Sequence, residues 1–120
     1  MKNKEDELLE FFDYLEKKRK QIMEELEPYY ERLDRRLEAH MNAYGIATPK
    51  DNCLLRELEV IINVENKLKL TQDIAKLKEN LNKKITEEKD TETIARLQKE
   101  AEVITEYEHS KNENTSNKTI

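Results

Sequence analysis

The chain holds a single glycine, Gly45, among its 120 residues. Folds built on many tight turns or phosphate-binding loops need several residues at positive φ, so this scarcity disfavours sandwiches, barrels and phosphate-loop folds. The rest of the composition is rich in the strong helix formers Glu, Lys, Leu, Arg and Gln. We therefore predict an all-α protein. Only 36% of the residues are hydrophobic, which is thin for a compact monomer.

Gly45 and the two prolines divide the chain. Residues 4–44 carry a heptad-like apolar stripe, and Pro28 interrupts it, so we expect either a kinked helix or a second helix that begins near Pro28. Gly45 suits a helix C-cap, Thr48 suits an N-cap, and Pro49 suits a first helical position. The connection would then be about three residues long, which predicts a helical hairpin.

A long helix is expected from Pro49 to Ile85. It would be about 55 Å long, which exceeds what this chain can cover, and its apolar stripe is wide between residues 54 and 64. Both features predict burial against other copies of the chain, as in a homo-oligomer; a monomeric coiled coil that bridges domains is the alternative. The expected core and interface residues are Tyr29, Tyr30, Leu54, Leu58, Ile61, Ile62 and Leu68.

Four segments follow from these patterns. Residues 1–27 form an N-terminal amphipathic helix, and residues 28–86 form the hairpin that serves as oligomerisation core. Residues 86–93 carry no apolar side chain, so a break near Asp90 is expected before a short C-terminal helix within 87–109; a continuous helix is the alternative. Residues 110–120 are rich in Asn, Ser, Thr and Lys and are expected to be disordered.

The net charge of −5 conceals an uneven distribution. Residues 1–44 are net −3, residues 45–86 are net +2, and residues 87–120 are net −4. Two basic runs stand out as candidate phosphate contacts, although the first encircles a helical turn and would be a solvated turn in a monomer. A ring would repeat each run around its axis and could bind a phosphate backbone without sequence specificity. The candidate DNA-binding residues are Lys17, Lys18, Arg19, Lys20, Arg32, Arg35 and Arg36.

Catalytic patterns are missing from the sequence. It contains no glycine-rich phosphate loop, no nucleophile elbow, and no His-x-x-x-His or Cys-x-x-Cys pair. We interpret His40 and Cys53 as packing residues and His109 as solvated. We therefore expect no enzyme activity, no cofactor and no metal site. With no apolar run long enough for a signal peptide or a membrane span, we also expect a cytosolic protein without a membrane partner.

The order of features around Gly45 resembles a known family. Glu27-Pro28-Tyr29-Tyr30 opens a helix that leads to Gly45-Ile46, and Thr48-Pro49-Lys50-Asp51 follows. The next residues are Leu54-Leu55-x-x-Leu58 and a long helix through Asn63, Lys67, Leu70 and Asp73. This pattern, over roughly residues 27–85, resembles the small subunits of bacteriophage terminases of the siphophage type.

The resemblance implies a ring-forming DNA-packaging protein of the host cytoplasm. Such a subunit recognises double-stranded viral DNA, delivers it to the large terminase subunit and modulates that motor's ATPase and nuclease. Two departures are visible: residues 1–27 contain no helix-turn-helix, and the C-terminal part is acidic instead of basic. The rival hypotheses are a coiled-coil adaptor or inhibitor from a mobile element that binds a protein and no DNA, and a helical transcription regulator.

Overall fold

The structure is a computed structural model that describes residues 3–42 and 44–118, with side chains described up to residue 111. Within these residues every regular element is a helix, which confirms the all-α prediction. The helices are α1 (Lys4–Glu25), α2 (Glu27–Glu38), α3 (Pro49–Thr71), α4 (Ile74–Glu87) and α5 (Thr91–Lys118).

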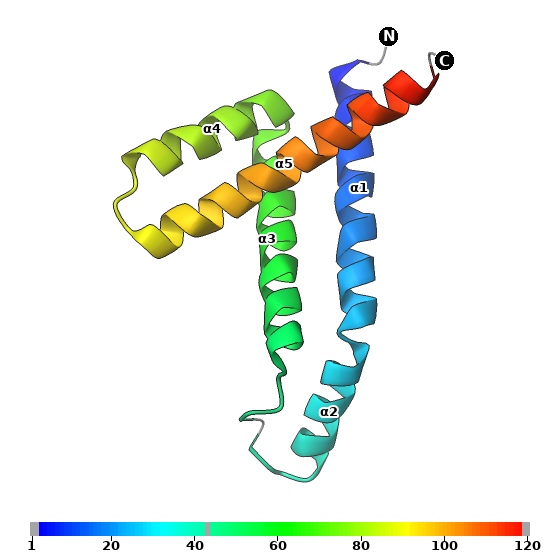
Figure 1. Cartoon of the computed structure of the whole chain (residues 1–120), viewed down its shortest axis with the longest axis vertical. Helices are drawn as coiled ribbons and strands as arrows, with labels where there is room; N and C mark the ends of the chain where they lie inside the picture. Colours follow the sequence, from blue (N-terminus) through cyan, green and yellow to red (C-terminus); the bar gives the residue numbers. More distant parts are fainter. Residues whose placement is uncertain (1–2, 43, 119–120) are drawn as a thin grey trace.

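Helices α1 and α2 follow one another along a single arm of the molecule (Figure 1). Asn3 caps α1 by accepting a 2.8 Å hydrogen bond from the backbone N–H of Asp6. The helix ends at Glu25, and Leu26 serves both as its C-cap and as the N-cap of α2. Pro28 was predicted either to kink one helix or to lie at the start of a second one. The structure confirms the second helix, because this proline lies in the first turn of α2.

The end of α2 differs from the prediction. The helix stops at Glu38, and His40 takes the left-handed conformation with φ 54°. Its N–H donates to the carbonyl of Leu37, and the N–H of Met41 donates to the carbonyl of Arg36 at 2.8 Å, which is the Schellman pattern. Gly45 therefore lies in the following loop with φ 79° and is no C-cap, and the connection spans residues 39–48 instead of about three.

Helix α3 begins where the sequence predicts and ends earlier. Thr48 and Asp51 form a capping box, and Pro49 occupies the first turn. The expected continuous helix to Ile85 is wrong, because Gln72 adopts the left-handed conformation with φ 54° and Asp73 caps a new helix, α4. At 23 residues α3 is about 35 Å long and not 55 Å, so the length of this helix does not require other copies of the chain to cover it.

Helices α4 and α5 pack against each other as a second pair (Figure 1). The break falls at residues 88–90, close to the expected position, and Asp90 accepts hydrogen bonds from the N–H and hydroxyl of Thr93 at the start of α5. Helix α5 continues to Lys118, so the expected disorder from Ser110 onward is not seen as far as the structure describes the chain. Residues 119 and 120 lie outside the described residues.

The core lies where α1, α3 and α5 meet. Helix α3 packs mainly against α1, so residues 1–27 supply the long helix with its main partner in place of the expected helix 28–44. Helix α5 lies across both of them (Figure 1). The fully buried side chains from these three helices include Phe11, Leu15, Val64, Leu68 and Ile104.

The molecule is elongated, with extents of 56 × 40 × 25 Å. Its radius of gyration of 17.5 Å exceeds the ~14 Å expected for a compact domain of this length. Two parts extend beyond the three-helix core: α2 with the following loop at one end, and the α4–α5 pair at the side (Figure 1).

Candidate functional site

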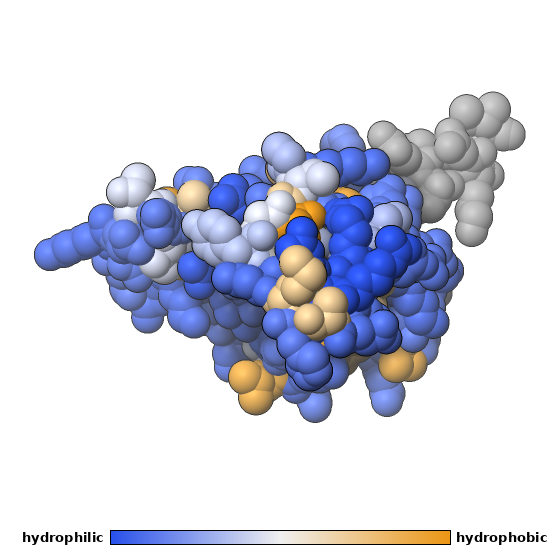
Figure 2. Space-filling model, turned by 90° about the horizontal axis from the view of Figure 1, so that it is seen from below, coloured by the Kyte–Doolittle hydropathy of each residue, from blue (hydrophilic) through white to orange (hydrophobic). Residues whose placement is uncertain are grey.

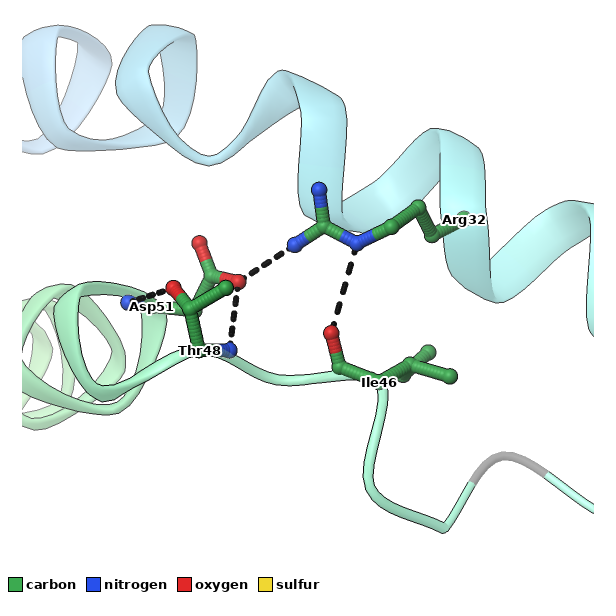
Figure 3. Close-up of polar contacts among 4 residues, drawn as sticks. All are labelled: Arg32, Ile46, Thr48 and Asp51. Atoms are coloured by element: carbon green, nitrogen blue, oxygen red, sulfur yellow. Dashed lines mark hydrogen bonds and ion pairs between the residues drawn. The ribbon is translucent and has the colours of Figure 1, made fainter.

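Arg32 joins α2 to the start of α3 (Figure 3). Its guanidinium pairs with the carboxylate of Asp51, and its Nε donates to the carbonyl of Ile46 at 3.3 Å. Asp51 is itself buried and also accepts a 2.9 Å hydrogen bond from the N–H of Thr48. One carboxylate therefore holds the N-terminus of α3 and the side of α2 together.

The charge of Asp51 is stabilised by these contacts. The backbone hydrogen bond from Thr48 lowers its pKa below the usual value, against the opposing effect of burial, and the hydroxyl of Thr48 and Arg32 lower it further. The predicted DNA contact Arg32 is thus engaged in an ion pair that organises the fold. Ile46 in the loop and Asp51 in the first turn of α3 thus both meet α2 at Arg32.

The side chains of the first basic run, residues 17–20, face α3, α5 and the solvent. Arg19 faces α3 and pairs with Glu65 at 3.0 Å, with only 12% of the Glu65 side chain exposed. Lys18 faces α5, where it pairs with Glu106 at 3.4 Å and lies 5.2 Å from the centre of the Tyr14 ring. Lys17 and Lys20 are exposed to solvent and pair with acidic residues one turn earlier on α1.

The ammonium group of Lys18 interacts with two side chains of the same chain, Tyr14 and Glu106. Burial lowers its pKa, but the hydroxyl of Tyr14 and the carboxylate of Glu106 outweigh that effect and leave the pKa above its usual value. Arg19 and Lys18 consequently act as ion pairs between helices, and Lys17 and Lys20 are the members of the run left on the outer surface.

The second basic run lies at the far end of α2. Arg35 is exposed in the last turn, and Arg36 is half-buried and donates to the carbonyl of Asn42 at 3.5 Å. These arginines are about 20 Å from Lys20 along the α1–α2 arm, given the rise of a helix. The structure therefore does not gather the seven predicted DNA contacts into one surface.

The predicted interface residues divide into two groups. Leu54, Ile61 and Leu68 are buried within the chain. Leu58, Tyr29 and Tyr30 are half-buried, with the two tyrosine rings in edge contact at 5.5 Å, and Ile62 is 40% exposed. Part of the wide stripe thus stays open on α3.

One buried charge was missed from the sequence. Glu100 on α5 is 1% exposed and accepts a 2.6 Å hydrogen bond from Lys67 on α3. Its spacing could have predicted the burial of Glu100. It follows Leu97 by three residues and precedes Ile104 by four, which puts it on the apolar face of its helix. The pair lines a groove with residues of both charge signs, including Lys84, Arg96 and Glu87.

An aromatic cluster fixes α5 onto α1. The ring of Tyr107 stacks on Phe11 at 4.5 Å and lies 5.1 Å from the ring of Tyr14. Among the described residues, the buried hydroxyl of Tyr107 finds no hydrogen-bond partner. Burial raises the pKa of Tyr107, and Glu10 and Glu7 raise it further.

The described residues offer no group of three or more His, Cys, Asp and Glu side chains that could hold a metal ion. None of the helices in the described part of the chain is both long enough and apolar enough to cross a membrane. Comparison with protein-family models, with curated proteins and with solved structures found no match to this chain.

Proposed function

We propose that the chain is the small subunit of a bacteriophage terminase, an oligomer that binds double-stranded viral DNA and delivers it to the large subunit. The observation that carries the proposal is the contact of Arg32 with Asp51 and Ile46. It makes one structural unit of the segments that resemble the family, namely the helix opened by Pro28 and the Thr48-Pro49-Lys50-Asp51 cap. No catalytic group is required of such a subunit, because the large subunit carries the ATPase and nuclease.

DNA binding by this subunit would depend on a few exposed lysines that each copy of the oligomer repeats. Lys17 and Lys20 are exposed on α1, and their acidic partners are also solvent-exposed, so these ion pairs cost little to exchange for phosphate. One chain supplies too few such charges for tight binding. A ring repeats them around its axis, and each phosphate contact adds to the dependence of affinity on salt.

The test is a salt titration of binding to a labelled DNA duplex, followed by fluorescence anisotropy. We expect the affinity to fall at least about tenfold between about 50 mM and about 200 mM salt. The Lys17→Glu/Lys20→Glu variant should lose binding. Its matched control, Lys83→Glu/Lys89→Glu, makes the same charge change on exposed residues of α4 and the α4–α5 turn and should keep binding.

A second function, a protein adaptor that binds no DNA, is favoured by one specific observation. Lys18, Arg19 and Arg32 are committed to Glu106, Glu65 and Asp51 within the chain, and the net charge is −5. The same titration separates the two functions. Binding at low salt that the Lys17→Glu/Lys20→Glu variant loses supports the terminase subunit, whereas no binding at the lowest salt supports the adaptor.

A further inference from the structure

The end of α2 and the loop after it carry three exposed apolar side chains. Leu37, Met41 and Tyr44 are 60%, 54% and 90% exposed, and we call these three residues the tip patch. The Schellman turn at His40 fixes the backbone between the first two, and the N–H of Tyr44 donates to the side chain of Asn42 at 2.9 Å. The view from this end shows apolar side chains in small areas on a mostly hydrophilic surface (Figure 2).

The charge around the tip patch is positive. Residues 34–50 contain Arg35, Arg36 and Lys50 against the acidic Asp34 and Glu38 and are net +1. Arg35 and Arg36 are in the last turn of α2, directly before the patch. A partner for this surface should therefore present an apolar side chain within acidic surroundings.

The opposite end of the same arm presents such a surface. Leu9, in the second turn of α1, is 62% exposed. Residues three and four positions apart are neighbours on a helix, which places Glu5, Asp6 and Asp13 around it, with half-buried Phe12 beside them. We call Leu9 with these four neighbours the α1 patch. Residues 3–13 are net −4, so the surroundings of the α1 patch are acidic.

We propose that the tip patch of one copy docks on the α1 patch of the next copy. Contacts between like patches are disfavoured, since tip on tip would oppose the arginines and α1 on α1 would oppose the carboxylates. The contact joins two different surfaces, so each copy of a pair keeps its other patch free, and the assembly grows into a ring or a filament. The inference rests on the self-association in the proposed function, and it assigns Arg35 and Arg36 to the contact between copies instead of to DNA.

Light scattering after size-exclusion chromatography of the full chain tests this contact. We expect a mass several times 14.4 kDa for the unchanged protein. A tip variant, Leu37→Asp/Met41→Asp, and an α1 variant, Leu9→Arg/Phe12→Arg, should each be monomeric alone. Mixed in equal amounts, they should form a complex of two chains, because one intact patch of each kind remains, and a contact between like patches would give no such complex.

Two controls keep the outcome unambiguous. Leu70→Asp changes an 88% exposed leucine outside both patches and should leave the mass unchanged, and circular dichroism reports whether each variant folds. Since Phe12 is half-buried, Leu9→Arg alone serves if the double variant unfolds. An oligomer that both patch variants leave intact, or variants that stay monomeric when mixed, would overturn the docking mode while the proposed function stands. A monomeric unchanged protein would overturn both.

Discussion

The carboxylate of Glu100 on α5 is 1% exposed and accepts a 2.6 Å hydrogen bond from the ammonium group of Lys67 on α3. This pair connects α5 to α3 through charge, in a groove that Lys84, Glu87 and Arg96 also line. The pair stabilises the folded state only while both partners are present, because the Glu100 carboxylate alone would be a buried charge without a counter-charge.

Replacement of Lys67 by Met should lower the free energy of unfolding by about 3–5 kcal/mol, because it leaves the Glu100 carboxylate buried without its cation. Urea unfolding measures the loss. The matched control is Lys78→Met, which breaks the Lys78–Glu108 pair, in which both side chains are 42% exposed, and should cost less than about 1 kcal/mol. Equal losses in the two variants would contradict the importance of burial at Glu100.

The capping carboxylate of Asp51 should make stability depend on pH. Because its pKa is lowered in the folded protein, its contribution is present above the usual value of 3.8 and is lost as the pH falls through the lowered pKa. We expect Asp51→Asn to be less stable than the unchanged chain at about pH 7 and the difference to shrink at about pH 3. Urea unfolding at both pH values gives the two differences, and a constant difference would show that the carboxylate charge contributes nothing.

Replacement of Tyr107 by Phe should stabilise the protein by about 1 kcal/mol. The change removes a buried hydroxyl that finds no partner among the described residues and keeps the ring stacked on Phe11. Thermal and urea unfolding both report the gain. Tyr14→Phe is the comparison, because the Tyr14 hydroxyl interacts with Lys18 and its loss should not stabilise. A loss of stability in Tyr107→Phe would mean that its hydroxyl is paired.

His40→Gly should stabilise the end of α2 by about 0.5–1 kcal/mol, because His40 holds a left-handed conformation that glycine adopts without strain. The control is Ala39→Gly at the preceding residue, where φ is −81° and glycine only adds freedom to the unfolded chain. Stability should rise in the first variant and fall in the second, as measured by urea unfolding. A change in stability of the same sign in both variants would contradict the left-handed conformation of His40.

The sequence predicted the features that depend on neighbours in the chain. The Thr48 cap was predicted from residue type, and the break near Asp90 from the lack of apolar side chains in residues 86–93. In the structure both helix starts carry an i to i+3 hydrogen bond. Both missed helix ends lie at non-glycine residues in the left-handed conformation, His40 and Gln72, where the usual signal of a C-terminal glycine does not exist.

The candidate site was harder to predict, because it depends on packing between distant segments. Lys18 and Arg19 are adjacent in sequence, yet one faces Glu106 and the other faces Glu65. A basic run therefore does not predict a basic surface until the acidic residues of the neighbouring helices are placed. The same holds for the wide stripe on α3, of which Ile61 is covered by the chain itself while Ile62 is not.

Light scattering of the full chain at low salt, alone and with a DNA duplex, measures self-association and DNA binding together. We expect a particle several times 14.4 kDa that elutes together with the DNA. A particle of one or two chains that leaves the DNA free would show that the protein is not a DNA-binding oligomer.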